Sequence, residues 1–143
     1  MQSNVHRNTL IPLRFDERTV LQDSNGQEMV ITLRLTQRDD LPQNVPKNDC
    51  TKWFDCDKIK CSLSVRTRKS GDYLVIGKGG ESKKLTRCMI DDRVPKESRE
   101  QIPLIADGEE IMWIVGGRIS ERYKITSCTR NILEITYQGG TRK

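Results

Sequence analysis

The fold of this chain is decided by residues 61–92, which read CSLSVRTRKSGDYLVIGKGGESKKLTRCMIDD. Apolar and polar residues alternate from 63 to 68, which is the period of a β-strand. The alternation places Arg66 and Arg68 together on the polar face of that strand. Ser70-Gly71-Asp72 predicts a turn, and the apolar run at 73–76 predicts a second, short strand.

A glycine-rich loop at 77–82 leads from this strand into a predicted helix over 83–92, with Ser82 as its N-cap. The apolar stripe of the helix has helical spacing and consists of Leu85, Cys88 and Met89. Lys83 and Arg87 then form a like-charge pair four residues apart, at a helix end whose dipole disfavours positive charge. No carboxylate is expected in that turn to relieve the repulsion, so the arrangement favours anion binding over a purely structural role.

The formal net charge of +5 arises entirely within residues 66–87 of this region. Residues 1–60 carry nine Lys and Arg against nine Asp and Glu, and residues 88–143 again carry nine against nine. Residues 66–87 carry seven basic residues against two acidic ones. A concentrated basic site suits a polyanion, because each phosphate that meets a cation releases condensed counterions. The alternative is a solvated basic face without a ligand.

The N-terminal part is predicted to form a β-hairpin over 19–35 around the turn dipeptide Asn25-Gly26, followed by a Pro- and Asp-rich linker at 38–49. We therefore divide the chain into a hairpin and linker (1–49), a main module (50–138) and a flexible tail (139–143). The hairpin is either an appended unit or part of the main module's sheet, and the sequence leaves both arrangements open.

Beyond Val94-Pro95, which ends the helix, one short helical turn is expected at 96–101. Further strands are predicted at 102–105, 111–115, 119–126 and 133–137. A strand-rich chain with one principal helix belongs to the α+β class, and we expect a small β-rich sandwich.

Composition limits the classes of protein that fit. Hydrophobic residues make up 34% and charged residues 31%, so the core is modest. Scarce aromatic residues are expected to anchor it: Trp53, Phe54, Tyr73, Trp113, Tyr123 and Tyr137. The sequence contains neither an apolar run of membrane-spanning length nor a signal-peptide core, so we expect a cytoplasmic protein with no membrane partner.

Five cysteines without a C-x-x-C pair predict free, mostly buried thiols rather than a metal site or disulfides. His6 is the single histidine, and no nucleophile elbow is present. The glycine loop at 77–80 lacks the spacing of a phosphate-binding loop. Acidic pairs such as Asp91-Asp92 are adjacent in sequence, and adjacent carboxylates usually point apart. We therefore expect no catalytic residue, no metal and no cofactor in this chain.

The motifs between about Trp53 and Thr126 resemble a known family. They are Val65–Asp72, Lys83-Lys84-Leu85, Ile90-Asp91-Asp92, Val94-Pro95, Arg99, Ile102-Pro103-Leu104 and Trp113–Lys124. In order and spacing they resemble the C-terminal substrate-binding domain of bacterial tRNA(Ile)-lysidine synthetase. The resemblance implies a fold shared with a domain of phenylalanyl-tRNA synthetase β-subunits.

The resemblance also implies a function. Members of the family ligate lysine to cytidine-34 of a minor isoleucine tRNA, and an N-terminal PP-loop domain that uses ATP and Mg²⁺ carries the chemistry. The Ser-Gly-Gly-x-Asp-Ser loop of that domain is absent from these residues. The expected partners are thus the tRNA, held by its acceptor stem, and the PP-loop domain. The alternative is a non-catalytic protein-interaction or dimerisation domain, in which the hairpin pairs edge to edge in a homodimer.

Carried over by position, the resemblance predicts tRNA contacts at a strand end, a helix start and the segment after Trp113. Together with the other cations of the basic stretch, Lys78 and Arg87, the predicted tRNA-binding set is Arg66, Arg68, Lys69, Lys78, Lys83, Lys84, Arg87 and Arg118. Gly71-Asp72 is expected to fix the turn, and Trp113 to lie in the core. In one departure, Arg87-Cys88 stands where the family more often has Lys-Asp, so the positive charge is kept and the carboxylate is lost.

Overall fold

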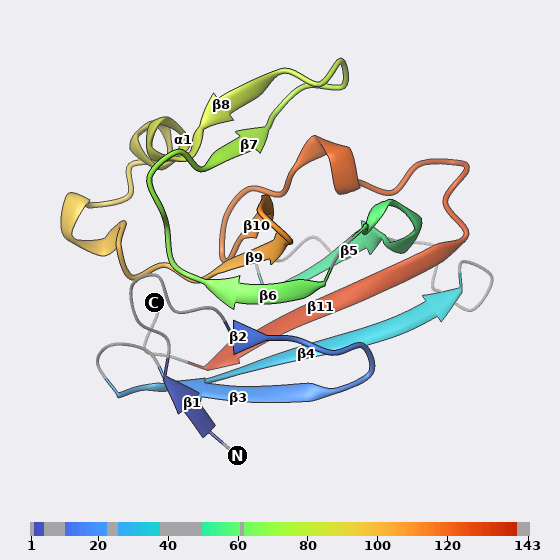
Figure 1. The fold of residues 1–143 in the computed structure, drawn as a ribbon, viewed down its shortest axis with the longest axis horizontal. Helices are drawn as coiled ribbons and strands as arrows, with labels where there is room; N and C mark the ends of the chain where they lie inside the picture. The colour runs from blue at the N-terminus through green and yellow to red at the C-terminus, as the bar shows by residue number, and fades with distance from the viewer. Residues whose placement is uncertain (1, 5–10, 23–25, 38–49, 61, 140–143) are drawn as a thin grey trace.

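A computed structural model describes residues 2–4, 11–22, 26–37, 50–60 and 62–139 of the chain. The structure has three layers (Figure 1). The first is a five-stranded sheet in the order β1 (Gln2–Asn4), β3 (Arg18–Gln22), β4 (Glu28–Gln37), β11 (Asn131–Gly139) and β5 (Thr51–Asp55). The second is a four-stranded sheet in the order β10 (Glu110–Ile114), β9 (Leu104–Asp107), β6 (Leu63–Arg66) and β2 (Ile11–Pro12).

The third layer consists of the hairpin of β7 (Tyr73–Val75) and β8 (Ser82–Lys84) together with α1 (Leu85–Asp91). Three short 3-10 turns complete the described structure: η2 (Cys56–Lys58), η3 (Lys96–Ser98) and η4 (Glu121–Tyr123). The predicted α+β class, a β-rich sandwich with one principal helix, is confirmed.

The predicted N-terminal hairpin forms from β3 and β4, which pair antiparallel with Thr19 opposite Ile31. Its second strand pairs along its length with β11, so the hairpin lies in the same sheet as the C-terminal strand. On its other side, β1 pairs with β3 over residues 20–22. The hairpin edge on which the dimerisation alternative depended is therefore covered over those residues. The predicted linker at 38–49 lies outside the described residues.

The four-stranded sheet is buried on both faces, because each of its faces meets another layer. Leu63, Val65 and Ile105 pack toward the five-stranded sheet in one apolar cluster. Leu104 and Ala106 pack in a second cluster with the apolar stripe of α1, which is Leu85, Cys88 and Met89 as predicted. All four residues of β6 are therefore buried, and the polar face of this strand, including Arg66, is covered by the third layer rather than by water.

The helix begins two residues later than the sequence predicts. Ser82 and Lys83 belong to β8, which pairs with β7, and the N-cap position is Lys84 without a side-chain cap. The predicted capping by Ser82 is thus wrong, because hydrogen bonds to β7 hold these residues extended. The predicted repulsion within the helix is also wrong, since Lys83 lies outside it and forms an ion pair with Asp91.

The predicted strands at 102–105, 111–115 and 133–137 are confirmed as β9, β10 and β11 with shifted ends. The strand predicted at 119–126 is wrong, because this segment makes one isolated bridge and then the turn η4. Ser120 caps that turn by accepting from the Arg122 N–H, and the buried Tyr123 hydroxyl donates to Asp107 at 2.9 Å.

Among the aromatic residues expected in the core, Trp53, Phe54, Trp113 and Tyr123 are buried and Tyr137 is half-buried. Tyr73 is 42% exposed, so its placement in the core is wrong. The described cysteines are free, but only Cys88 is buried, and the expectation of mostly buried thiols is wrong. Across the described ranges, no helix has the length and apolar character to cross a membrane, and no cluster of three or more metal-ligating side chains occurs.

Candidate nucleic-acid interface

A tight turn over 67–72 connects β6 to β7, and a buried ion pair holds it. Arg66 is 1% exposed, and its guanidinium donates two hydrogen bonds to the Asp72 carboxylate, at 2.9 and 3.0 Å. The same carboxylate accepts from the Lys69 N–H at 2.8 Å. The turn closes with Asp72 N–H donating to the Lys69 carbonyl, and Gly71 at its third position has a φ of +89°, as a type II turn requires. Arg66 therefore acts inside the molecule, and its charge does not reach the surface.

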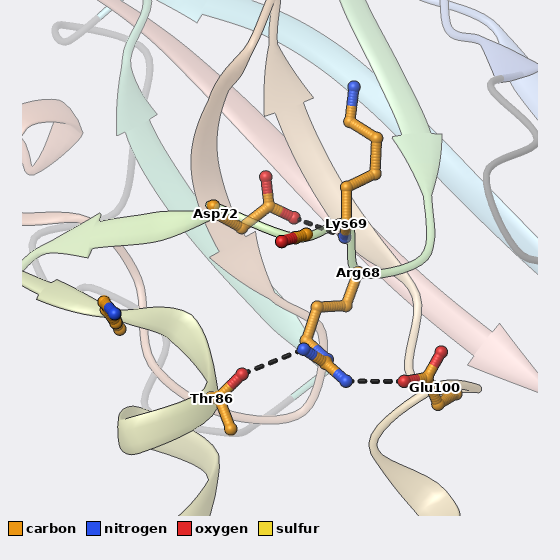
Figure 2. Close-up of a pocket in the computed structure, with 8 residues that line it drawn as sticks. Arg68, Lys69, Asp72, Thr86 and Glu100 are labelled. Atoms are coloured by element: carbon orange, nitrogen blue, oxygen red, sulfur yellow. Dashed lines mark hydrogen bonds and ion pairs between the residues drawn. The ribbon is translucent and has the colours of Figure 1, made fainter.

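Arg68 fastens this turn to the third layer (Figure 2). One guanidinium nitrogen donates to the Thr86 hydroxyl in the first turn of α1 at 2.9 Å, and another forms an ion pair with Glu100, beyond η3. Three segments that are distant in sequence thus meet at a single side chain. Because Glu100 neutralises Arg68, this arginine mainly holds the turn in place and adds little free positive charge to the surface.

The turn and the junction of β8 with α1 enclose a hollow of about 540 Å³. Its lining comes from both elements: Arg68, Lys69, Ser70, Gly71, Asp72, Lys84, Thr86 and Glu100. The two carboxylates of the lining are engaged, Asp72 by Arg66 and Glu100 by Arg68. Lys69 and Lys84 therefore supply the net positive charge of the hollow.

These two lysines are only weakly neutralised. The Lys69 ammonium lies 3.7 Å from a carboxylate oxygen of Glu109, whose side chain is 92% exposed, so the pair is loose and screened by solvent. Lys84 is exposed, and no ion pair to it is found within the described ranges. The predicted strand end and helix start do come together in space, with Arg68, Lys69 and Lys84 around one hollow.

A second group of predicted cations gathers around Asp91 and Asp92 at the end of α1. Lys83 pairs with Asp91, and its hydrogen bond lowers the pKa of that carboxyl below 3.8. Arg118 donates two hydrogen bonds of 2.8 Å to Asp92, which raises the pKa of the arginine. Arg87 is exposed and close enough to contribute to the lowered pKa of Asp91. In this group, two of the three positive charges are neutralised by neighbours.

The last predicted cation, Lys78, stands apart in the loop between β7 and β8 and does not line the hollow. The loop is folded around Glu81, whose carboxylate accepts from the Gly79 N–H at 3.2 Å. A side chain at Gly77 would place its Cβ 2.0 Å from this carboxylate, so the exposed Glu81 side chain would have to move aside.

Two exposed residues near the hollow were not predicted as part of a site. Tyr73 lies directly opposite Lys84 in the β7–β8 ladder. Arg122 pairs with Glu110, whose hydrogen bond raises the pKa of the arginine, and the charge of Tyr73 adds a smaller contribution in the same direction. No sequence signal could identify Tyr73 as a surface residue, because residues 82–84 were predicted to begin a helix and not a partner strand.

Comparison with solved structures shows the class of fold first. The chain aligns with a structure described as "Crystal structure of TILS C-terminal domain", with a TM-score of 0.73 over 94% of this chain and 98% of that one. The sequence identity is 22%, so this likeness shows the fold alone.

The family follows from the sequence comparisons. The model of the TilS substrate C-terminal domain matches residues 63–135, just over half of the chain, and the chain belongs to this family. It is 44% identical over 92 residues to the tRNA(Ile)-lysidine synthase of Caldanaerobacter subterraneus subsp. tengcongensis, covering 64% of this chain and 20% of that protein. It is 46% identical over 94 residues to that of Clostridium tetani, covering 65% and 20%. The chain thus matches about a fifth of the length of these curated relatives.

Proposed function

We propose that this chain is a tRNA-binding domain that docks the acceptor stem of a minor isoleucine tRNA. The observation that carries the proposal is the hollow between the turn 67–72 and the β8–α1 junction. There Lys69 and Lys84 face the same space while both carboxylates of the lining are occupied by arginines. The family relationship supplies the class of ligand, because its members are named as enzymes that act on tRNA(Ile).

The chemistry of the hollow suits an RNA backbone. A-form RNA hides its base edges in a deep and narrow major groove, so proteins recognise the duplex mostly through phosphates and 2′-hydroxyls. Two lysines meet the phosphates, and the exposed Ser70 at the rim adds a hydroxyl that can donate or accept. The lining contains no aromatic ring on which a base could stack.

Binding to three RNAs tests the proposal: the whole tRNA, a hairpin copy of its acceptor stem, and a hairpin copy of its anticodon stem-loop. We expect the chain to bind the first two with similar affinity and the third more weakly. Equal affinity for both hairpins would reduce the site to a non-specific basic surface. Failure to bind any of the three at 50 mM salt would overturn the proposal.

A charge-matched pair of variants locates the site. Lys69→Gln with Lys84→Gln removes the two lysines of the hollow, whereas Lys58→Gln with Lys60→Gln removes two exposed lysines at η2 and before β6. Both variants change the net charge by the same amount. We expect only the first to weaken binding, and to lower the slope of log affinity against log salt by about two, because each phosphate contact contributes roughly 0.9. Equal losses in the two variants would contradict a defined site.

For the enzyme as a whole, we propose that a separate PP-loop domain ligates lysine to cytidine-34 with ATP and Mg²⁺ while this domain holds the acceptor stem. The names of the relatives and the share of their length that the chain matches support this division. Lysine-dependent ATP turnover is expected to be absent with this chain alone. It should appear when the PP-loop domain and tRNA are added, and turnover by the isolated chain would refute the division.

A further inference from the structure

The exposed aromatic ring of Tyr73 is not accounted for by docking of a duplex. Tyr73 begins β7 and is 42% exposed, while the next two residues, Leu74 and Val75, are buried to 1% and 2%. The hairpin therefore packs against the body along most of β7 and leaves one aromatic side chain open at its start.

The β-ladder sets the position of this ring relative to the hollow. Tyr73 and Lys84 are directly opposite each other in the antiparallel pair β7–β8, so their side chains leave the same face, with Cβ atoms about 5 Å apart. Lys84 also lines the hollow, and so does Asp72, the residue before Tyr73. The ring thus lies beside the proposed phosphate site and shares Lys84 with it.

The ring has a cation beside it. Lys84 is on the same face of the ladder, and the acidic residue next to Tyr73 in sequence, Asp72, is engaged by Arg66. An exposed aromatic face next to a lysine that has no ion pair within the described residues matches one nucleotide, with its base on the ring and its phosphate on the ammonium. Stacking on such a ring needs a base with an open face. Inside a duplex both faces of a base are covered by neighbouring pairs, whereas a nucleotide at the end of the duplex or beyond it has one open face.

We infer that Tyr73 stacks on the first unpaired nucleotide beyond the end of an RNA duplex, and that Lys84 holds the phosphate of this nucleotide. The site therefore takes a junction between duplex and single strand, of the kind at the 3′ end of an acceptor stem, and not any stretch of duplex. The inference rests on the proposed function and adds to it the part of the RNA that the domain recognises.

Two RNAs test the inference: a blunt-ended hairpin and the same hairpin with a 3′ extension of four nucleotides. Stacking of one base is expected to make the wild-type chain bind the extended RNA roughly fivefold to a hundredfold more tightly than the blunt one. Tyr73→Leu keeps an apolar side chain but removes the flat ring, and we expect it to abolish this difference while leaving the affinity for the blunt RNA unchanged. Tyr73→Phe should retain the difference, and Lys84→Gln should weaken binding of both RNAs.

A fluorescent base separates stacking from a general loss of structure. With 2-aminopurine at the first unpaired position, binding of the wild type and of Tyr73→Phe should quench its fluorescence, and binding of Tyr73→Leu at saturating protein should not. Phe15→Leu is the matched control, because Phe15 is an aromatic residue of similar exposure, 40%, in the segment between β2 and β3. It should behave as the wild type.

The outcomes separate the inference from the proposed function. If the wild type binds both RNAs equally, or if Tyr73→Leu weakens both by the same factor, the inference is overturned while RNA binding stands. If the wild type binds neither RNA, the proposed function fails, and the inference fails with it.

Discussion

Arg66 and Lys84 belong to the same basic stretch but have opposite surroundings. Arg66 at the end of β6 is 1% exposed and holds Asp72 with two hydrogen bonds. Lys84 at the start of α1 is exposed and borders the hollow, and within the described part of the chain no carboxylate pairs with it. The first residue shapes the turn, and the second offers charge to a ligand. Local net charge therefore indicates where a polyanion site lies, but it does not show which cations make the contact.

The buried ion pair of Arg66 with Asp72 also determines which charges remain on the surface. Withdrawing Asp72 into the structure removes one of only two acidic side chains of residues 66–87 from the surface. Its carboxylate also accepts from the Lys69 N–H, so the same interaction that neutralises Arg66 orients the backbone of Lys69. Such pairs are costly to desolvate and often add little net stability, but they specify one arrangement of the chain.

Breaking this pair should have the largest effect. Arg66→Ala leaves the buried Asp72 carboxylate, whose side chain is 7% exposed, without its partner, and removal of one member of a buried pair costs about 3–5 kcal/mol. We expect a loss of this size in the free energy of unfolding, measured by urea denaturation. Arg34→Ala, at an exposed position of β4, is the control and should change it by less than about 0.5 kcal/mol. A stable Arg66→Ala variant that loses RNA affinity would instead place Arg66 in the interface.

A second prediction compares Lys84, which borders the hollow, with Lys83, which is paired with Asp91. Lys84→Gln removes one phosphate contact, which is worth roughly eightfold in affinity at 0.1 M salt and 0.9 in the salt slope. Replacing both members of an ion pair, as Lys83→Gln with Asp91→Asn, leaves the net charge unchanged, and we expect affinity and slope to change little. Fluorescence titrations with the acceptor-stem hairpin at several salt concentrations measure both quantities. A larger loss in the double variant would show that Lys83 leaves Asp91 to bind RNA.

The different roles of Arg66 and Lys84 show what a sequence pattern can predict and what it cannot. Alternation in 63–68 correctly predicts a strand, but the polar face of that strand was expected to meet water. A third layer covers it, because β7, β8 and α1 pack on the four-stranded sheet. The pattern of β6 alone contains no information on that layer, and Arg66 was consequently assigned to the surface set.

The same limit applies to residues 82–84 and to Tyr73. Ser-Lys-Lys before an apolar stripe is as compatible with a helix start as with a strand, and only pairing with β7 decides between them. Once β8 is a strand, Tyr73 stands opposite Lys84 and outside the core. The sequence could thus predict which two elements form the hollow, but the partner of each cation depends on long-range contacts such as Arg68 with Glu100 and Arg118 with Asp92.

A third prediction concerns Gly71, which lies in the turn between the exposed Ser70 and Asp72, whose side chain is buried. Its φ of +89° disfavours any residue with a Cβ, although an added Cβ would meet no atom within 4 Å. Gly71→Ala should therefore cost about 1 kcal/mol of unfolding free energy through backbone strain alone, with RNA affinity retained. Gly71→Asn should cost less, because asparagine tolerates positive φ better. A large loss of affinity in Gly71→Ala at unchanged stability would indicate that RNA approaches the backbone of the turn.

The smallest expected effect concerns the ion pair between Lys83 and Asp91. The hydrogen bond from Lys83 lowers the pKa of Asp91 in the folded chain below its ordinary value of 3.8. A carboxyl with a lowered pKa contributes stability above its unfolded pKa, and this contribution is lost as the pH falls through the folded value. The contribution of the pair is therefore fully present at neutral pH, and it is lost only as the pH falls below about 4. NMR titration of the Asp91 carboxyl should show its pKa rising toward 3.8 in Lys83→Gln. An unchanged pKa would mean that the pair does not form in solution, and Lys83 would then join Lys84 among the cations free to meet a phosphate.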